Sequence, residues 1–183
     1  VVGADGRPWF VAEGGVSHFD GDRCVTYTAA YGLPEGKLTA IGAGPDGGVW
    51  VGGEHGLASF DGSTWQLYGT DDGLAHDSIR DISVDAEGRT WLATAGGVVC
   101  REGGEWRRYP AQGLVNRSVR EIAVDSTGRI YFGTEEGLCS FDGEAWRSYV
   151  GERGAPVGKV TGLAVDRRGG GAEAVVAGCE CLR

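Results

Sequence analysis

Two histidines with acidic neighbours come closest, in this sequence, to a catalytic or metal-binding arrangement. His55 follows Glu54, and His76 precedes Asp77. An imidazole beside a carboxylate can act as a general base or contribute to a metal site. The third and last histidine, His18, stands where other copies of the repeat described below have Ser59, Cys100 and Ser140. We therefore interpret the histidines as solvated or structural residues and predict no catalytic site.

Two charged pairs recur at equivalent places along the chain. Arg80-Asp81 and Arg120-Glu121 stand 40 residues apart, and each opens an apolar segment. A guanidinium presents several donors in a fixed fork that suits carboxylates or vicinal hydroxyls, so these pairs can contact a polar ligand such as a sugar. They can equally form salt bridges between neighbouring structural units, and the sequence leaves both interpretations open. The predicted ligand-binding set is His55, Asp71, Asp72, Arg80, Asp81, Arg120, Glu121, Glu135 and Glu136.

The cysteines and the Asp-Gly turns do not indicate a metal or a cofactor. The cysteines are five in number, and Cys179-x-Cys181 has no nearby histidine to complete a zinc site. We interpret them as reduced or buried thiols, while a disulfide between repeats stays open. The Asp-x-x-Gly turns lack the alternating oxygen ligands of a calcium loop, and an aspartate that caps its own turn explains them better. We predict no metal and no cofactor.

A repeat of about 41 residues positions these side chains. Its marker is an aromatic residue after a turn, at Trp9, Trp50, Trp91 and Tyr131. A Gly-rich turn and a short apolar run come next, followed by Phe-Asp-Gly in three of the four copies. The third copy has Arg101-Glu102 instead, which we expect only to loosen one hairpin. Three later tryptophans each stand three residues before a tyrosine, and the first copy has Cys24 at that place; these are Trp65, Trp106 and Trp146.

Each repeat is predicted to form four short β-strands. In the second copy they cover 38–44, 49–53, 57–60 and 64–68. Runs of about five residues rich in Val, Ile, Trp, Tyr and Thr, separated by Asp-Gly turns, are typical of hairpins. No segment has helical periodicity. A repeated four-stranded unit of this length is the signature of a β-propeller blade. The sequence therefore predicts an all-β fold, a β-propeller of about four blades that is a fragment of a larger propeller.

The predicted propeller covers residues 1–166. It comprises a partial first blade at 1–37, three blades at 38–78, 79–118 and 119–159, and the start of a further blade at 160–166. The last strand either pairs with the N-terminal piece and closes a small ring or begins the next blade of an open arc. Residues 167–183 lack the aromatic marker and form a degenerate blade, a linker or a tail. The three later tryptophans are expected to be largely buried between blades, where they fill the gap.

Composition narrows the function classes. Glycine accounts for 35 of 183 residues, which fits a fold made of tight turns. A net charge of −9 disfavours nucleic acid, because its phosphates would be repelled. No stretch approaches the roughly 18 apolar residues that span a bilayer. The sequence begins in the middle of a repeat, so any targeting or membrane segment is expected outside it.

The order of these motifs along each repeat resembles that of a known repeat family. Gly-Leu-Pro, an apolar strand, Asp-x-x-Gly, Trp-Val-Gly, Gly-Leu, Phe-Asp-Gly, Trp and Tyr resembles the two-component regulator propeller repeat. Residues 46–68, followed by Gly73-Leu74, match best, and the resemblance covers residues 1 to about 166. In that family such repeats build the extracytoplasmic sensor propellers of hybrid histidine kinases and related regulators, which often respond to carbohydrates. The resemblance implies a non-catalytic ligand-sensing or interaction propeller for signal transduction, in the periplasm or outside the cell.

Two other functions fit the same repeat. Streptogramin lyases are propellers with similar repeats, so a propeller lyase or hydrolase is one alternative, and a cytoplasmic protein-interaction scaffold is another. The expected partner is a small polar ligand such as a carbohydrate, or a protein. In a propeller, the loops that enter the innermost strands share one face with the turns between the second and third strands. We place the candidate site on that face, because loops on a rigid scaffold tolerate variation.

Overall fold

The chain folds almost entirely into antiparallel strands. The computed structural model describes residues 1–3, 6–44, 48–109, 113–150, 158–166 and 174–180. The first sheet contains β1 (Trp9–Ala12), β2 (Gly15–Phe19) and β3 (Cys24–Tyr27). Three four-stranded sheets follow: β4 (Leu38–Ala43), β5 (Val49–Gly53), β6 (Gly56–Phe60) and β7 (Trp65–Tyr68); β8 (Ile79–Val84), β9 (Thr90–Thr94), β10 (Gly97–Glu102) and β11 (Glu105–Tyr109); β12 (Val119–Val124), β13 (Ile130–Thr134), β14 (Leu138–Phe141) and β15 (Trp146–Ser148). The last sheet pairs β16 (Lys159–Asp166) with β17 (Ala174–Glu180).

The helices of the described residues are two single turns. These are the 3-10 helices η1 (Ala29–Tyr31) and η2 (Thr70–Asp72), and each lies in a loop that enters an inner strand. Both end at a glycine in the left-handed region, Gly32 and Gly73. Among the residues that the structure places, no helix is long and apolar enough to cross a membrane.

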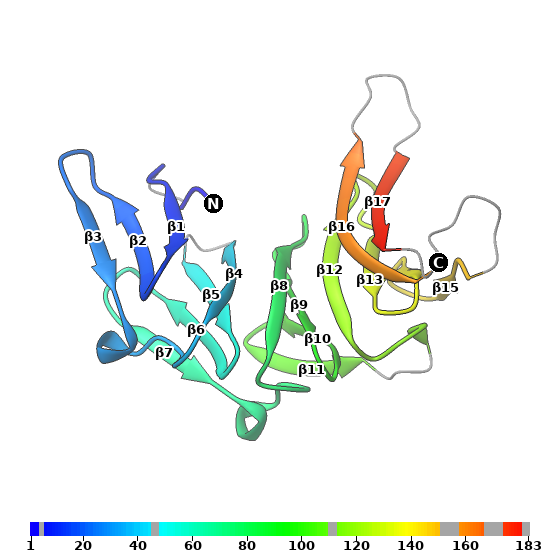
Figure 1. Ribbon diagram of the computed structural model, residues 1–183, viewed down its shortest axis with the longest axis horizontal. Helices are drawn as coiled ribbons and strands as arrows, with labels where there is room; N and C mark the ends of the chain where they lie inside the picture. Colours follow the sequence, from blue (N-terminus) through cyan, green and yellow to red (C-terminus); the bar gives the residue numbers. More distant parts are fainter. Residues whose placement is uncertain (4–5, 45–47, 110–112, 151–157, 167–173, 181–183) are drawn as a thin grey trace.

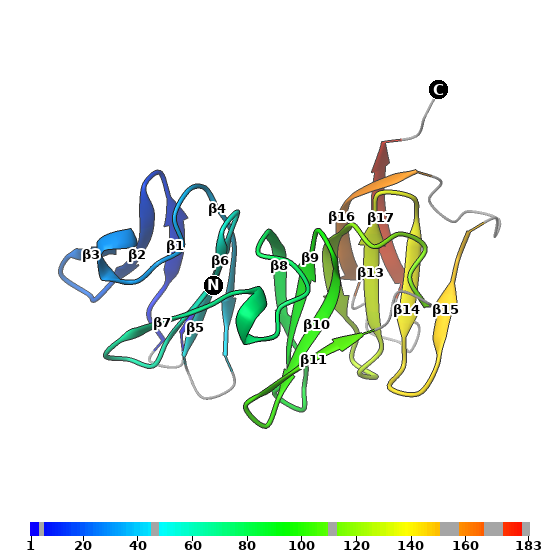
Figure 2. The ribbon, with the colours of Figure 1, turned by 90° about the horizontal axis from the view of Figure 1, so that it is seen from below.

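The sheets stand next to one another as an arc (Figure 1, Figure 2). Their first strands, β4, β8, β12 and β16, lie on the concave side, and these inner strands contact their neighbours along the arc. This arrangement confirms the all-β, β-propeller prediction. The first sheet lies at one end of the arc and β16 at the other, so the described residues form an open arc rather than a small closed ring. Part of the predicted tail, β17, pairs with β16, while 167–173 and 181–183 lie outside the described residues.

Aromatic side chains fill the space between neighbouring sheets. Trp9, Trp50 and Trp91 are 4%, 5% and 0% exposed, and each lies in a separate apolar cluster that joins two sheets. Burial of such large rings supplies much of the free energy that holds one sheet to the next. The later tryptophans also pack between sheets as predicted, and most of the surface of each is buried, although they sit on the outermost strands; these are Trp65, Trp106 and Trp146.

The turns that follow inner strands are fixed by aspartate. Asp85 Oδ1 accepts a hydrogen bond from the Arg89 backbone N–H at 2.8 Å. Its Oδ2 accepts from the Arg89 Nε at 2.7 Å and from the indole N–H of Trp91 at 2.7 Å. The same carboxylate therefore caps its turn and satisfies the one polar atom of a buried tryptophan. This geometry agrees with the interpretation of these turns as self-capping.

The expectation of a loosened third hairpin is wrong. β10 and β11 pair through Glu102 opposite Glu105, one rung beyond the Phe60–Trp65 pair that ends the equivalent hairpin of the preceding sheet. The connecting residues are Gly103 and Gly104, with φ of 58° and 93°. Two consecutive positive-φ residues form the tight turn whose twist matches that of the strands, so this hairpin is longer than its neighbours.

Candidate functional site

A repeated β-bulge sets the position of the candidate site. In each complete inner strand the register shifts by one residue at the same place, which leaves one residue without a partner on the next strand. A bulge re-aims the side chain of the extra residue. The bulge residues along the arc are Thr39, Arg80, Arg120 and, in the last sheet, Thr161.

The two bulge arginines converge on one carboxylate. Arg120 Nη1 lies 2.8 Å from Glu135 Oε1, and Arg80 Nη1 lies 3.4 Å from the same oxygen. Arg80 Nη1 also donates to Ser118 Oγ at 2.6 Å. Arg80 belongs to β8, whereas Glu135 follows β13 in the next sheet, so this contact joins two sheets. Of the two interpretations that the sequence left open, the structure contains the salt bridge between neighbouring sheets.

Charge stabilises the ionised form of this carboxylate. The hydrogen bond from Arg120 lowers the pKa of Glu135, and the positive charges of Arg120, Arg80 and Lys159 lower it further. The side chains of Arg80, Arg120 and Glu135 keep 27%, 32% and 33% of their surface exposed. The cluster is therefore held together and still reachable from solvent.

Asp81 ties two inner strands together through backbone hydrogen bonds. Its Oδ1 accepts from the Ile82 N–H and its Oδ2 from the Ile122 N–H, both at 2.8 Å. Burial raises the pKa of Asp81. Burial also raises the pKa of Glu121, and the neighbouring charge of Asp81 raises it further. Both carboxyl groups of the predicted pairs thus sit in less polar surroundings than Glu135.

A second group of predicted residues lines a separate hollow beside η2. His55, Asp71 and Asp72 border a pocket of about 270 Å³, together with Asp77. Asp72 Oδ2 accepts from the Gly69 N–H at 2.7 Å, and Asp77 Oδ1 accepts from the Thr70 N–H at 2.8 Å. These carboxylates close the loop on itself. The structure therefore divides the predicted set, with Arg80, Asp81, Arg120, Glu121 and Glu135 in the inner-strand cluster and His55, Asp71 and Asp72 in this pocket.

No pocket formed by the described residues is lined by both of the histidines first considered for chemistry. His55 borders the pocket beside η2, whereas His76 Nδ1 accepts a hydrogen bond from the Ser78 N–H at 2.9 Å. Glu136, the remaining predicted site residue, is exposed next to Glu135. Within the described ranges, no group of three or more His, Cys, Asp or Glu side chains could hold a metal ion.

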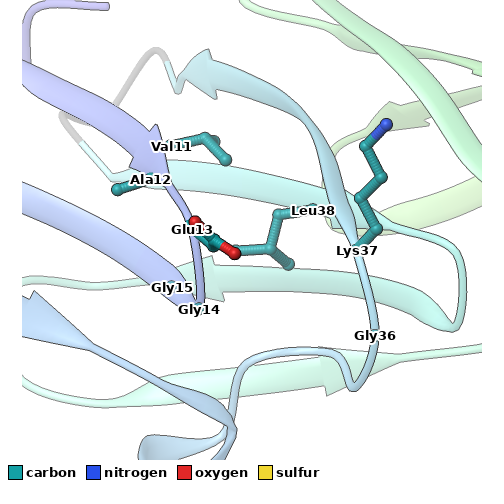
Figure 3. Close-up of a pocket in the computed structure, with 8 residues that line it drawn as sticks. All are labelled: Val11, Ala12, Glu13, Gly14, Gly15, Gly36, Lys37 and Leu38. Carbon is teal, nitrogen blue, oxygen red and sulfur yellow. The ribbon is translucent and has the colours of Figure 1, made fainter.

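Sequence reasoning missed the largest of the described pockets. It has a volume of about 460 Å³ and lies between β1 and the start of β4 (Figure 3). Val11, Ala12 and Leu38 give it apolar surface, and Glu13 and Lys37 are the charged residues of its lining. In the next sheet Gly53 is the residue equivalent to Ala12, and there the inner strand β4 covers it, because Leu38 pairs with Gly53. The pocket thus lies at the β1 edge of a three-stranded sheet. Its Gly-rich turns contain no chemical motif from which the sequence could have predicted it.

The chain resembles solved propellers in fold. No family model matches it, and no curated protein does either. The extracellular domain of a hybrid two-component system from B. thetaiotaomicron superposes with a TM-score of 0.81 at 21% identity, over 96% of this chain and 26% of that one. The extracellular domain of a one-component system from the same organism gives 0.70 at 18% identity, over 90% and 24%. Virginiamycin B lyase from Staphylococcus aureus gives 0.64 at 13% identity, over 86% and 57%.

These similarities confirm the propeller fold. The proteins matched include extracellular domains of two-component systems, the class of protein in which the resembled repeat occurs. The chain spans about a quarter of the length of these two extracellular-domain structures.

Proposed function

We propose that this chain is part of a ligand-sensing β-propeller, outside the cytoplasm, that belongs to a two-component type of regulator. The repeat motifs and the likeness to extracellular sensor domains support this role. We place ligand binding at Arg80, Arg120 and Glu135 within the inner-strand cluster. A protein partner on the same face is a second form of the proposal.

One observation carries the site: two guanidinium groups from neighbouring sheets meet at a single carboxylate oxygen, Glu135 Oε1. The bulges hold both arginines at the start of inner strands, where a ligand would touch more than one blade. A ligand that bridges two blades changes the contact between them, and a sensor can pass such a change to attached domains. An enzymatic role of the lyase kind has less support, because the acidic side chains around His55 hold their own loop.

The test is a binding screen with a matched pair of double variants. Arg80→Ala/Arg120→Ala removes the two inner arginines. Arg107→Ala/Arg147→Ala removes the same charge from exposed outer strands. Binding of a mono- or oligosaccharide panel should disappear in the first variant and persist in the second. Persistence of binding in the inner variant would place the ligand elsewhere.

Stability separates a binding role from a structural one. Partly exposed ion pairs contribute about 1 kcal/mol or less each, so the inner double variant should still unfold cooperatively, with a loss of about 2 kcal/mol at most. A much larger loss in thermal unfolding would show that both arginines serve mainly to join the sheets. Turnover of a bound ligand by the unaltered chain, removed by His55→Ala, would instead favour the lyase alternative.

A further inference from the structure

Positive charge surrounds the Glu135 carboxylate. Arg80 and Arg120 contact it directly, and the charges of Arg80, Arg120 and Lys159 all stabilise its ionised form. Both oxygens of Asp81 accept backbone N–H groups, and the charge of Arg120 also acts on Glu121. Glu135 is therefore the carboxylate that both guanidinium groups contact, and a ligand anion would compete with it for them.

The donors of the cluster are also incompletely used. A guanidinium has five N–H donors. Arg120 contacts Glu135 through Nη1, while its Nε is buried and has no hydrogen-bond partner among the described residues. A buried donor without a partner costs free energy, which an acceptor placed beside it would recover. Arg80 Nη1 donates to both Ser118 Oγ and Glu135 Oε1, and the contact with Glu135 is the longer of the two.

Building on the proposed function, we propose that this cluster binds the anionic group of an acidic ligand, a carboxylate or a sulfate on a sugar, and that Glu135 occupies the same place when no ligand is bound. The ligand anion would take the position of the Glu135 carboxylate between the two arginines. Bidentate contacts from arginine suit both kinds of anion. Glu135 belongs to the turn between β13 and β14 and is one-third exposed, so its side chain can turn outward without unfolding a strand.

The bulge position then determines specificity. The equivalent residue is Thr39 on one side of the cluster, and its hydroxyl donates to the backbone carbonyl of Ile79 in the next sheet. Threonine at the bulge thus bonds sheet to sheet, whereas arginine at the same position reaches a carboxylate. Two successive arginines create the anion site, and the residue type at each bulge decides which blades contribute to it.

Two variants with the same change in charge test the proposal. Glu135→Gln removes the internal carboxylate, and Glu136→Gln removes the exposed neighbouring one. The probes are sodium glucuronate, glucose 6-sulfate and neutral glucose, and binding to the full chain is measured by calorimetry. Glu135→Gln should tighten binding of an anionic probe by about tenfold, the effect of one charged hydrogen-bond partner. Glu136→Gln should change it by less than about twofold, as expected for an exposed charge.

Each outcome has a definite meaning. Glucuronate and the sulfate ester separate a carboxylate site from a sulfate site. Equal tightening in both variants, or no binding of either anion to folded Glu135→Gln at millimolar concentration, would overturn the proposal. Thermal unfolding checks the fold, and Glu135→Ala, which also frees the arginines, should give the same order of probes. If glucose binds, depends on Arg80 and Arg120, and ignores the change at Glu135, the sensing site stands and the acidic ligand does not.

Discussion

Arg101 lies over the ring of Trp50, with its guanidinium carbon 5.2 Å from the ring centroid. The same carbon lies 5.8 Å from the Tyr68 ring and 5.7 Å from the Trp106 ring. In the adjacent interfaces the corresponding place among the aromatic rings is taken by Phe60 and Phe141. A cation has thus replaced a phenyl ring between two sheets, where the faces of three rings attract it.

Removing this cation should weaken the contact between sheets. Arg101→Ala is expected to lower the free energy of unfolding by about 2 kcal/mol, the upper range for a desolvated cation on aromatic rings. Arg101→Phe should recover most of that loss, because phenylalanine fills the same place elsewhere. The control is Arg107→Ala, whose guanidinium lies 5.2 Å from the Tyr109 ring on an exposed strand and should cost less than about 1 kcal/mol. If chemical denaturation shows equal losses of unfolding free energy for Arg101→Ala and Arg107→Ala, Arg101 has no special role between the sheets.

Gly73 should be far less tolerant of a side chain than Gly62. Both have positive φ, 118° and 100°, so alanine is strained at each. A Cβ on Gly73 would lie 3.0 Å from Trp106 Cβ, whereas a Cβ on Gly62 meets nothing within 4 Å. Gly62→Ala should cost about 1 kcal/mol, and Gly73→Ala should cost about 1 kcal/mol or more beyond that. Similar unfolding free energies would show that the loop moves away from Trp106.

Glu121 should make the chain less stable as the pH rises through the mildly acidic range. Burial raises the pKa of Glu121 in the folded state, so between the unfolded and folded values the folded chain binds more protons. Stability then falls as the pH increases through that window, and Glu121→Gln should remove this decline. Glu135 acts in the opposite direction, because its lowered pKa gives stability that is lost as the pH falls through the folded value. Thermal unfolding of Glu121→Gln and Glu135→Gln, measured from mildly acidic pH down to pH values below the ordinary glutamate pKa, checks the two signs, with Glu136→Gln as the control.

Thiol reactivity should distinguish Cys24 from the buried cysteines. Cys24 is exposed, whereas burial raises the pKa of Cys100 to about 12 and that of Cys139 to about 11. A thiolate is the reactive form, so the buried pair should be inert near neutral pH. In a Cys179→Ser/Cys181→Ser background, a thiol reagent should modify one cysteine in the folded chain and three after unfolding. Fast modification of a second thiol in the folded chain would show that a sheet opens.

The regular spacing of the sequence was enough to predict the blades. The aromatic marker recurs every 40 or 41 residues. Few folds other than a propeller combine a repeat of that length with short strands separated by glycine turns. Self-capping by Asp85 was also readable, because an aspartate bonds to backbone within its own turn. The position of Arg80 and Arg120 at equivalent places followed from the repeat alone.

The partners of these residues depended on the tertiary structure. The bulge that aims Arg80 and Arg120 is a register shift between strands, which no local pattern in the chain records. Arg80 meets Glu135 across two sheets and 55 positions, and that distance depends on how blades pack. For the same reason the sequence grouped His55 with the arginines, although the fold places it in a separate pocket beside η2. Sequence periodicity determines which residues are equivalent, whereas contacts between blades decide which of them meet.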